Sequence, residues 1–251
     1  MIVTDKSIEH PLTILDLILT TVVVTIGATL QGSVGLGLGM FGAPMLMLID
    51  PGFIPGPLLC AALVLTLLLT HRERHSIHFP DLRWALSGRV VGIILGLGML
   101  ASLSPDRLRL VFGVLILVGV VISASGLHLR ISPRTLVAAG GLSGLMGTTI
   151  SVGGPAMALI YQHSSGARIR GTLSAYFVVG VSMSLVGLRV IGLFGREQLM
   201  LTAVLLPGIL LGYLVSRHTA SALDKGYTRL ALLSVSAAAA ILVMLRQLLA
   251  V

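Results

Sequence analysis

Two glycine-rich stretches hold the residues of this sequence that are best suited to bind an anion. One reads QGSVGLGLGMFGAP over residues 31–44, and the other reads GTTISVGGP over residues 147–155. Each ends in a proline, which suits the first turn of a helix and not its middle. Where a helix begins, unpaired backbone N–H groups and the positive end of the helix dipole attract an anion, and glycine lets it approach. We therefore predict that a small anion binds at these breaks, to Gln31, Ser33, Gly35, Gly37, Gly39, Thr148, Thr149, Ser151, Gly153 and Gly154.

These residue types also have purely structural interpretations, which the sequence leaves open. The glycines could let two membrane helices pack closely, as small residues often do. The hydroxyls of Thr148, Thr149 and Ser151 could bond a carbonyl of the preceding helical turn instead of a ligand. For the stretch GRVVGIILG at residues 88–96, close packing is the favoured interpretation.

Arg89 and Arg189 are the two cations that fall inside apolar segments of the chain. A charge within a membrane span points to function by default. Each also lies near the end of its segment, so a side chain that extends to the lipid headgroups is the alternative. We add Arg89 to the predicted substrate-binding residues, because its segment also carries the glycines Gly88 and Gly92 that are matched in the second half of the chain.

The histidines His71, His75 and His78 have the spacing of a histidine box, as found in membrane di-iron oxidases. Such enzymes need several boxes, and this basic loop holds the one such cluster, so a solvated loop is the favoured interpretation. No nucleophile–base set or phosphate-binding loop motif is present. We expect no enzyme activity, no catalytic residue, no metal and no cofactor, and we keep a membrane enzyme that uses this loop as the weaker alternative.

The composition is that of an integral membrane protein. The 251 residues are 55% hydrophobic and 10% charged, with a mean hydropathy of +1.03, whereas soluble domains are about a quarter charged. The net charge of +8 lies mostly in short loops and is not interleaved with aromatic residues, so we expect a lipid bilayer and not nucleic acid as the partner. Residues 1–11 lack a basic leader and a cleavage site, which predicts a retained tail.

Ten apolar segments predict an all-α polytopic membrane protein with about eight to ten transmembrane segments. They cover residues 12–31, 35–49, 56–70, 84–103, 108–128, 134–150, 154–162, 171–193, 198–216 and 228–250. The stretch from Gly32 resembles the stretch from Gly144, and GRVVG at residue 88 matches GILLG at residue 208. We therefore predict two homologous halves, residues 12–130 and 131–251, with broken helices meeting at the centre. Because five is an odd number of crossings, the second half begins on the other side of the membrane and is therefore inverted relative to the first.

The distribution of Lys and Arg predicts the orientation of the chain. If all ten segments cross and the loop 71–83 is cytoplasmic, ten cations lie inside and five outside. If the two short segments do not cross, the division is eight against seven, which is no bias. Because cytoplasmic loops carry the excess of basic residues, we expect both termini outside and the loop 71–83 in the cytoplasm.

The stretch GLMGTTISVGGPAMALIYQ, followed by RGTLSAYFVVG, resembles the sulfite exporter TauE/SafE family, also called the toluene sulfonate uptake permease family. The likeness runs over almost the whole chain from about residue 20. Where the first copy of the family pattern usually has three consecutive glycines, this chain has GMFGAP. The resemblance implies a duplicated polytopic transporter of sulfite, sulfonates or related sulfur-containing anions.

Taken together, these observations predict a secondary transporter, and an exporter in particular, of small sulfur-containing anions that works by alternating access. A membrane protein that binds an anion without transporting it is the alternative. The expected location is the inner membrane of a bacterium, as a multi-pass protein and possible homo-oligomer.

Overall fold

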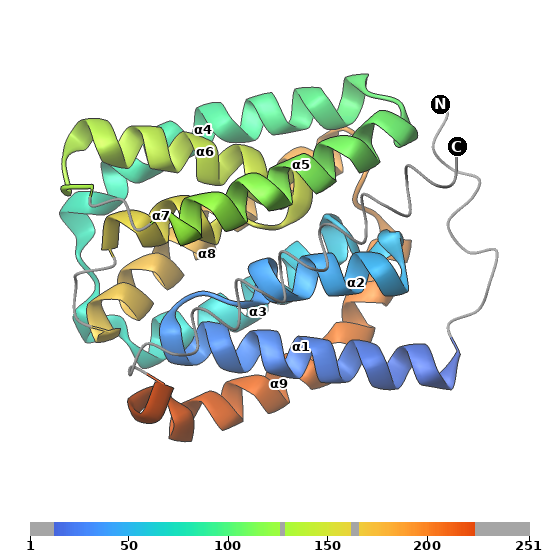
Figure 1. Cartoon of the computed structure of the whole chain (residues 1–251), viewed down its shortest axis with the longest axis horizontal. Helices are drawn as coiled ribbons and strands as arrows, with labels where there is room; N and C mark the ends of the chain where they lie inside the picture. Colours follow the sequence, from blue (N-terminus) through green and yellow to red (C-terminus); the bar gives the residue numbers. More distant parts are fainter. Residues whose placement is uncertain (1–12, 126–128, 162–165, 224–251) are drawn as a thin grey trace.

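The computed structural model describes residues 13–125, 129–161 and 166–223, and every regular element in these ranges is helical (Figure 1). The α-helices are α1 (Ile14–Val34), α2 (Ala43–Ile49), α3 (Gly56–Arg72), α4 (Phe79–Ser102), α5 (Pro105–Ala124), α6 (Pro133–Ile150), α7 (Gly154–Tyr161), α8 (Gly166–Val190) and α9 (Arg196–Leu223). Three short elements, η1 (Leu38–Gly42), η2 (Pro51–Phe53) and η3 (Arg74–Ser76), lie between them. The all-α prediction is confirmed for the described residues, and the predicted tail 1–11 and last segment 228–250 lie outside them.

Within the described ranges, four helices are long and apolar enough to cross a membrane: α1, α4, α8 and residues 196–220 of α9. In helix α4, some residues face the outside of the bundle and others are buried against neighbouring helices. Val91, Ile94 and Leu95 are more than half exposed, whereas Gly88, Gly92 and Gly96 are buried. Large apolar side chains on an outer face fit a helix surrounded by lipid.

Glycine allows the closest helix contacts in the bundle. A Cβ atom built on Gly88 would lie 2.0 Å from the carbonyl oxygen of Val137 on α6, and one on Gly92 would lie 1.9 Å from that of Gly141. These separations leave no room for any side chain, so the backbones of α4 and α6 touch directly. Close packing is therefore what the structure shows at Gly88 and Gly92.

The first glycine-rich stretch interrupts the chain after α1. Gly35 ends the helix with a φ of 91°, and Gly37 has a φ of 154°, values that residues with a side chain rarely adopt. The chain then turns into η1 and α2, which together span Leu38–Ile49. At 1.5 Å per residue this segment is about 18 Å long, well short of the roughly 30 Å of a bilayer core.

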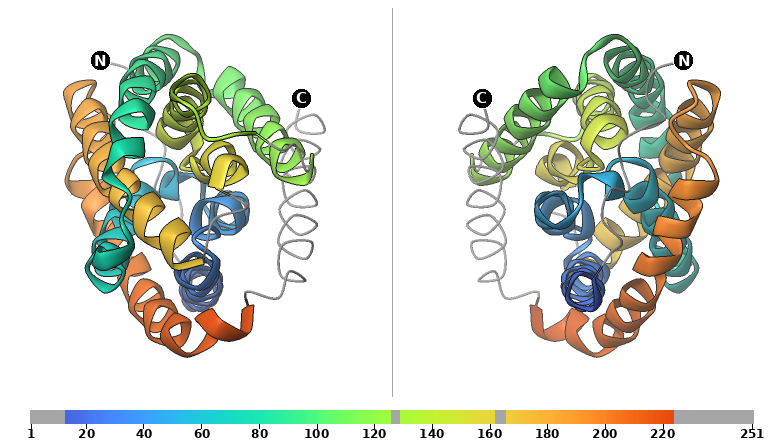
Figure 2. Two further views of the ribbon diagram at one scale, coloured as in Figure 1. Left: turned by 90° about the vertical axis from the view of Figure 1, so that its left-hand side faces the viewer. Right: turned by 90° about the vertical axis from the view of Figure 1, so that its right-hand side faces the viewer.

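The second stretch interrupts the chain after α6 in a similar way. Ser151 ends the helix with a φ of 61°, and α7 begins at Gly154. Helix α7 is about 12 Å long, so it too is shorter than a membrane span. The end-on views in Figure 2 show α2 and α7 near the middle of the bundle, between the longer helices. The predicted breaks at both glycine-rich stretches are therefore present.

Several helix ends meet at one end of the bundle. Arg72, the last residue of α3, donates to the carbonyl of Gly32, and Arg170 on α8 donates to that of Ser33 at 3.1 Å. Glu73 accepts a hydrogen bond of 3.1 Å from the Nε atom of each arginine. Because the last carbonyls of a helix carry partial negative charge, the two guanidinium groups stabilise the end of α1.

Helix α4 begins earlier than the predicted segment 84–103, because Phe79 and Pro80 already form its first turn. The helix therefore includes Asp81, which is 7% exposed. Its carboxylate accepts a hydrogen bond of 3.0 Å from the hydroxyl of Tyr161 at the end of α7, and it lies 3.5 Å from the guanidinium of Arg168. This pairing ties the end of α7 to α4 and α8.

Candidate anion-binding site

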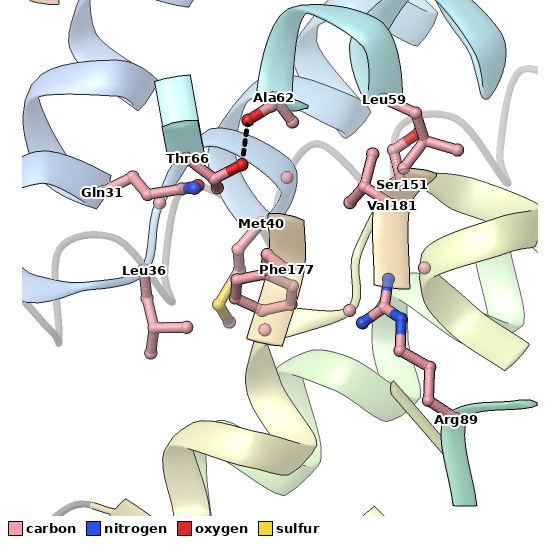
Figure 3. Close-up of a pocket in the computed structure, with 15 residues that line it drawn as sticks. Gln31, Leu36, Met40, Leu59, Ala62, Thr66, Arg89, Ser151, Phe177 and Val181 are labelled. Carbon is pink, nitrogen blue, oxygen red and sulfur yellow. Dashed lines mark hydrogen bonds between the residues drawn. The ribbon is translucent and has the colours of Figure 1, made fainter. Parts of the chain in front are cut away.

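A cavity of about 40 Å³ lies where the two breaks come together (Figure 3). Its walls come from both halves of the chain: Gln31, Leu36, Gly37, Gly39, Met40, Leu59, Ala62, Thr66, Arg89, Gly147, Ser151, Gly153, Gly154, Phe177 and Val181. The volume holds roughly three water molecules. An ion of a few non-hydrogen atoms is the size of guest that such a cavity accepts.

Arg89 is the one ionisable side chain among these wall residues. It lies near the middle of α4 and is 1% exposed. Its guanidinium carbon lies 4.7 Å from the ring centre of Tyr176 and 5.5 Å from that of Phe177, and Figure 3 shows it directed toward the other wall residues. The side chain is enclosed by protein and does not extend to the lipid headgroups, so that alternative is excluded for Arg89.

The guanidinium of Arg89 is only partly satisfied. Its Nη1 atom donates to the hydroxyl of Ser143 at 3.3 Å, and its buried Nε atom has no hydrogen-bond partner among the described residues. No carboxylate in the described part of the chain pairs with it within 4.0 Å. A buried cation without a counter-charge carries a large desolvation cost, so a bound anion would be strongly favoured here.

Glycines on two other helices make room for this side chain. A Cβ atom on Gly180 of α8 would lie 1.8 Å from the Nε atom of Arg89, and one on Gly147 of α6 would lie 3.5 Å from Nη2. A Cβ atom on Gly144 would come within 2.5 Å of the backbone oxygen of Arg89. The path of Arg89 across α6 and along α8 therefore depends on glycine at Gly144 and Gly180.

Ser143 connects Arg89 to the second break. This fully buried hydroxyl donates to the carbonyl of Gly153 at 2.5 Å while it accepts from Arg89. Sequence reasoning missed Ser143, although a signal was available: it directly precedes Gly144, as Gln31 directly precedes the matched Gly32.

Gln31 has a related role at the first break. Its Oε1 atom accepts a hydrogen bond of 3.2 Å from the backbone N–H of Leu38, the first residue of η1. A Cβ atom on Gly39 would lie 2.2 Å from the carbonyl oxygen of Ser151, and one on Gly154 would lie 2.6 Å from the side chain of Leu36. The two breaks are therefore in direct contact with each other.

The structure brings seven of the predicted site residues to the cavity wall: Gln31, Gly37, Gly39, Arg89, Ser151, Gly153 and Gly154. Four others do not line it. Ser33 shares a hydrogen bond of 2.9 Å with Thr219, and Gly35 lies against Ile169. Thr148 shares a hydrogen bond of 2.9 Å with Ser184. The hydroxyl of Thr149 donates to the carbonyl of Leu145 on its own helix at 2.8 Å, which is the structural interpretation that the sequence left open.

The histidines of the α3–α4 connection make local contacts. The Nδ1 atom of His78 lies 2.9 Å from the carboxylate of Asp81, and Nε2 of His75 accepts from Nε of Arg74 at 3.1 Å. Within the described residues, no three His, Cys, Asp or Glu side chains gather closely enough to hold a metal ion.

A model of the sulfite exporter TauE/SafE family matches residues 19–243 of this chain. Neither the curated proteins nor the solved structures include a significant match. The family match covers all the described helices except the first residues of α1, and it agrees with the membrane-length apolar helices. The chain is therefore a multi-pass membrane transporter that belongs to the sulfite exporter TauE/SafE family.

Proposed function

We propose that this transporter carries a small sulfur-containing anion, such as sulfite or a small organosulfonate, through the cavity that contains Arg89. One observation carries the proposal: a cation lies near the middle of an apolar helix, 1% exposed, and has no carboxylate partner among the described residues. The rings of Tyr176 and Phe177 offset part of its desolvation cost. An anion in the cavity offsets the rest.

The N-terminal end of α7 supplies a second attraction. Gly153 and Gly154 line the cavity directly before and at the first turn of α7, where a helix carries a partial positive charge of about 0.5. Neither glycine has a side chain that would keep a ligand away from the backbone N–H groups. The anion would thus lie between the Arg89 guanidinium and the beginning of α7.

The two halves, 12–130 and 131–251, form an inverted repeat in this proposal. Two interfaces support it. Helix α4 of the first half packs on α6 through Gly88 and Gly92, and α9 of the second half packs on α1 through the matched glycines. On α9, a Cβ atom on Gly208 would lie 2.8 Å from the side chain of Val24, and one on Gly212 would lie 2.5 Å from that of Ala28.

The orientation with the loop 71–83 in the cytoplasm has support from the arrangement of helix ends. Figure 1 shows the α3–α4 connection and the beginnings of α6 and α8 at its left side, with the α4–α5 and α8–α9 connections at its right. The left-hand ends carry most of the arginines of the loops, as expected of the cytoplasmic side. We also propose that the protein lies in the inner membrane of a bacterium and exports its substrate. One half would rock against the other to expose the site to each side in turn.

Flux through purified protein in liposomes tests this function. Radiolabelled sulfite trapped inside should leave liposomes that contain the protein faster than protein-free liposomes. Arg89→Gln should reduce the flux by at least about tenfold, the effect of losing roughly 1.4 kcal/mol of binding free energy. Arg189→Gln is the matched control, because Arg189 is exposed near the end of α8 and does not line the cavity. Equal flux with and without the protein, for sulfite and for small sulfonates alike, would refute the proposal.

A further inference from the structure

We infer that the site selects anions by charge: Arg89 matches the cavity to an oxyanion with one negative charge and disfavours a dianion of the same shape. This inference rests on the proposed function and deepens it, because it defines which chemical form of a sulfur oxyanion is the substrate. Hydrogensulfite and alkylsulfonates carry one charge, whereas sulfate carries two. The distinction separates substrates that differ little in size.

The charge balance of the cavity carries the argument. Among its described wall residues Arg89 supplies one full positive charge, and none carries a carboxylate. The beginning of α7 adds a partial charge of about 0.5. The other side chains of the wall are apolar or uncharged, including Phe177, Val181 and Leu59. One negative charge on the ligand is therefore balanced, and a second one has no full counter-charge.

Burial makes this imbalance costly. The side chain of Arg89 is 1% exposed, and the empty cavity has room for only about three waters, which a bound ion would largely displace. A second ligand charge would lose its hydration without gaining an ion pair, and an unpaired charge of this kind is strongly unfavourable in a protein interior. A neutral ligand is also disfavoured, because the buried cation of Arg89 then has no counter-charge.

Among the described residues, no charged side chain other than Arg89 lines the cavity. Glu73 is held by Arg72 and Arg170, and Asp81 is paired with Arg168 and His78. Neither acidic residue lines the cavity. Both clusters lie at helix ends, whereas Arg89 lies in the middle of α4. The charge that the ligand meets is thus set by Arg89.

Three ligands of one shape test the inferred preference for one negative charge, which we call the charge rule. Sulfate, methanesulfonate and dimethyl sulfone have the same number of non-hydrogen atoms around a tetrahedral sulfur, and they carry two, one and no negative charges. Their charges do not change near neutral pH, unlike those of sulfite and phosphate. Calorimetry on the detergent-purified full chain should give methanesulfonate the highest affinity, by at least about tenfold over each of the others. Equal or tighter binding of sulfate would overturn the inference without the use of any variant.

Variants of Arg89 provide the second arm. Arg89→Gln should lower the affinity for methanesulfonate by at least about tenfold and leave the neutral sulfone as the best ligand of the three. Arg89→Lys, which keeps the charge but not the planar guanidinium, should keep the order of the three ligands. Arg189→Gln should leave both affinity and order unchanged. An unchanged preference for methanesulfonate in a folded, monodisperse Arg89→Gln protein would also overturn the inference.

The same measurements separate this inference from the proposed function. If sulfite is transported and sulfate binds as tightly as methanesulfonate, the charge rule fails and the proposed transport stands. If no sulfur anion binds or moves, the proposed function fails, and the charge rule fails with it.

Discussion

The hydroxyl of Ser143 links Arg89 to the break between α6 and α7. Its Oγ atom accepts a hydrogen bond of 3.3 Å from Nη1 of Arg89 and donates one of 2.5 Å to the carbonyl of Gly153. A cation on one helix is thus coupled through one side chain to the backbone that begins α7. A shift of the break relative to the guanidinium would disturb these two hydrogen bonds.

Ser143→Ala should weaken binding of methanesulfonate by about tenfold, because the change removes a hydrogen bond to a charged group and leaves the carbonyl of Gly153 without its partner. Ser182→Ala is the control, since the hydroxyl of Ser182 donates only to the carbonyl of Val178 on its own helix. Calorimetric affinities of the two variants check this expectation. Native affinity in Ser143→Ala would show that the link has no part in ligand binding.

Gly180→Ala should abolish anion binding, because its methyl group would occupy the position of the Nε atom of Arg89. The control is Gly98→Ala on α4, where a Cβ atom would meet nothing within 4 Å. That substitution should leave binding intact and raise the stability by up to about 1 kcal/mol through helix propensity. Thermal unfolding and calorimetry measure both effects. Unaltered binding in Gly180→Ala would mean that Arg89 does not need its observed path.

Valine at the breaks should block the ligand. Gly153→Val would place its Cβ atom 3.0 Å from the backbone oxygen and the hydroxyl of Ser143, and its remaining atoms would extend the obstruction at the cavity wall. Gly39→Val would separate the two breaks, since its Cβ atom would lie 2.2 Å from the carbonyl of Ser151. Thr149→Val should keep its affinity within about twofold, because its hydroxyl bonds its own helix. A folded Gly153→Val protein with native affinity would place the ligand elsewhere.

Glu73→Gln should reduce the free energy of unfolding by about 2 kcal/mol, a value between those of exposed and buried ion pairs. The substitution leaves the guanidinium groups of Arg72 and Arg170 next to each other without the carboxylate that both contact. Arg74→Gln is the control, because the one side-chain contact described for Arg74 is with His75. Added salt should shrink the deficit of Glu73→Gln by screening the two cations. A deficit that does not respond to salt would contradict this electrostatic origin.

Cysteine labelling should place the α3–α4 connection in the cytoplasm. In a Cys60→Ala background, His75→Cys should stay unlabelled by a membrane-impermeant thiol reagent added to intact cells, and Arg196→Cys at the beginning of α9 should react. Both positions lie in or next to connections at opposite ends of the bundle. The reverse pattern would invert the proposed topology.

Local patterns in the sequence were sufficient for the membrane class, for the approximate positions of the described helices and for the breaks. Hydropathy marks the helices because lipid requires long apolar segments. Glycine and proline mark the breaks because they act on the backbone of their own residues. Arg89 could also be proposed as a site residue from the sequence, because a cation inside an apolar segment points to function. The family match over residues 19–243 agrees with the resemblance seen in these motifs.

Only the tertiary structure decided which polar groups face the cavity. Thr148 and Thr149 precede the second break and lie outside the cavity wall. Ser143 is not part of the wall either, but it contacts Arg89 from a position ten residues before Gly153. Gly180 is essential to the path of Arg89 although it lies on α8, far away in the sequence. The reason is geometric: the face that a helix turns to a cavity depends on how it crosses helices that are distant in the chain. Hydropathy and glycine spacing do not encode that crossing.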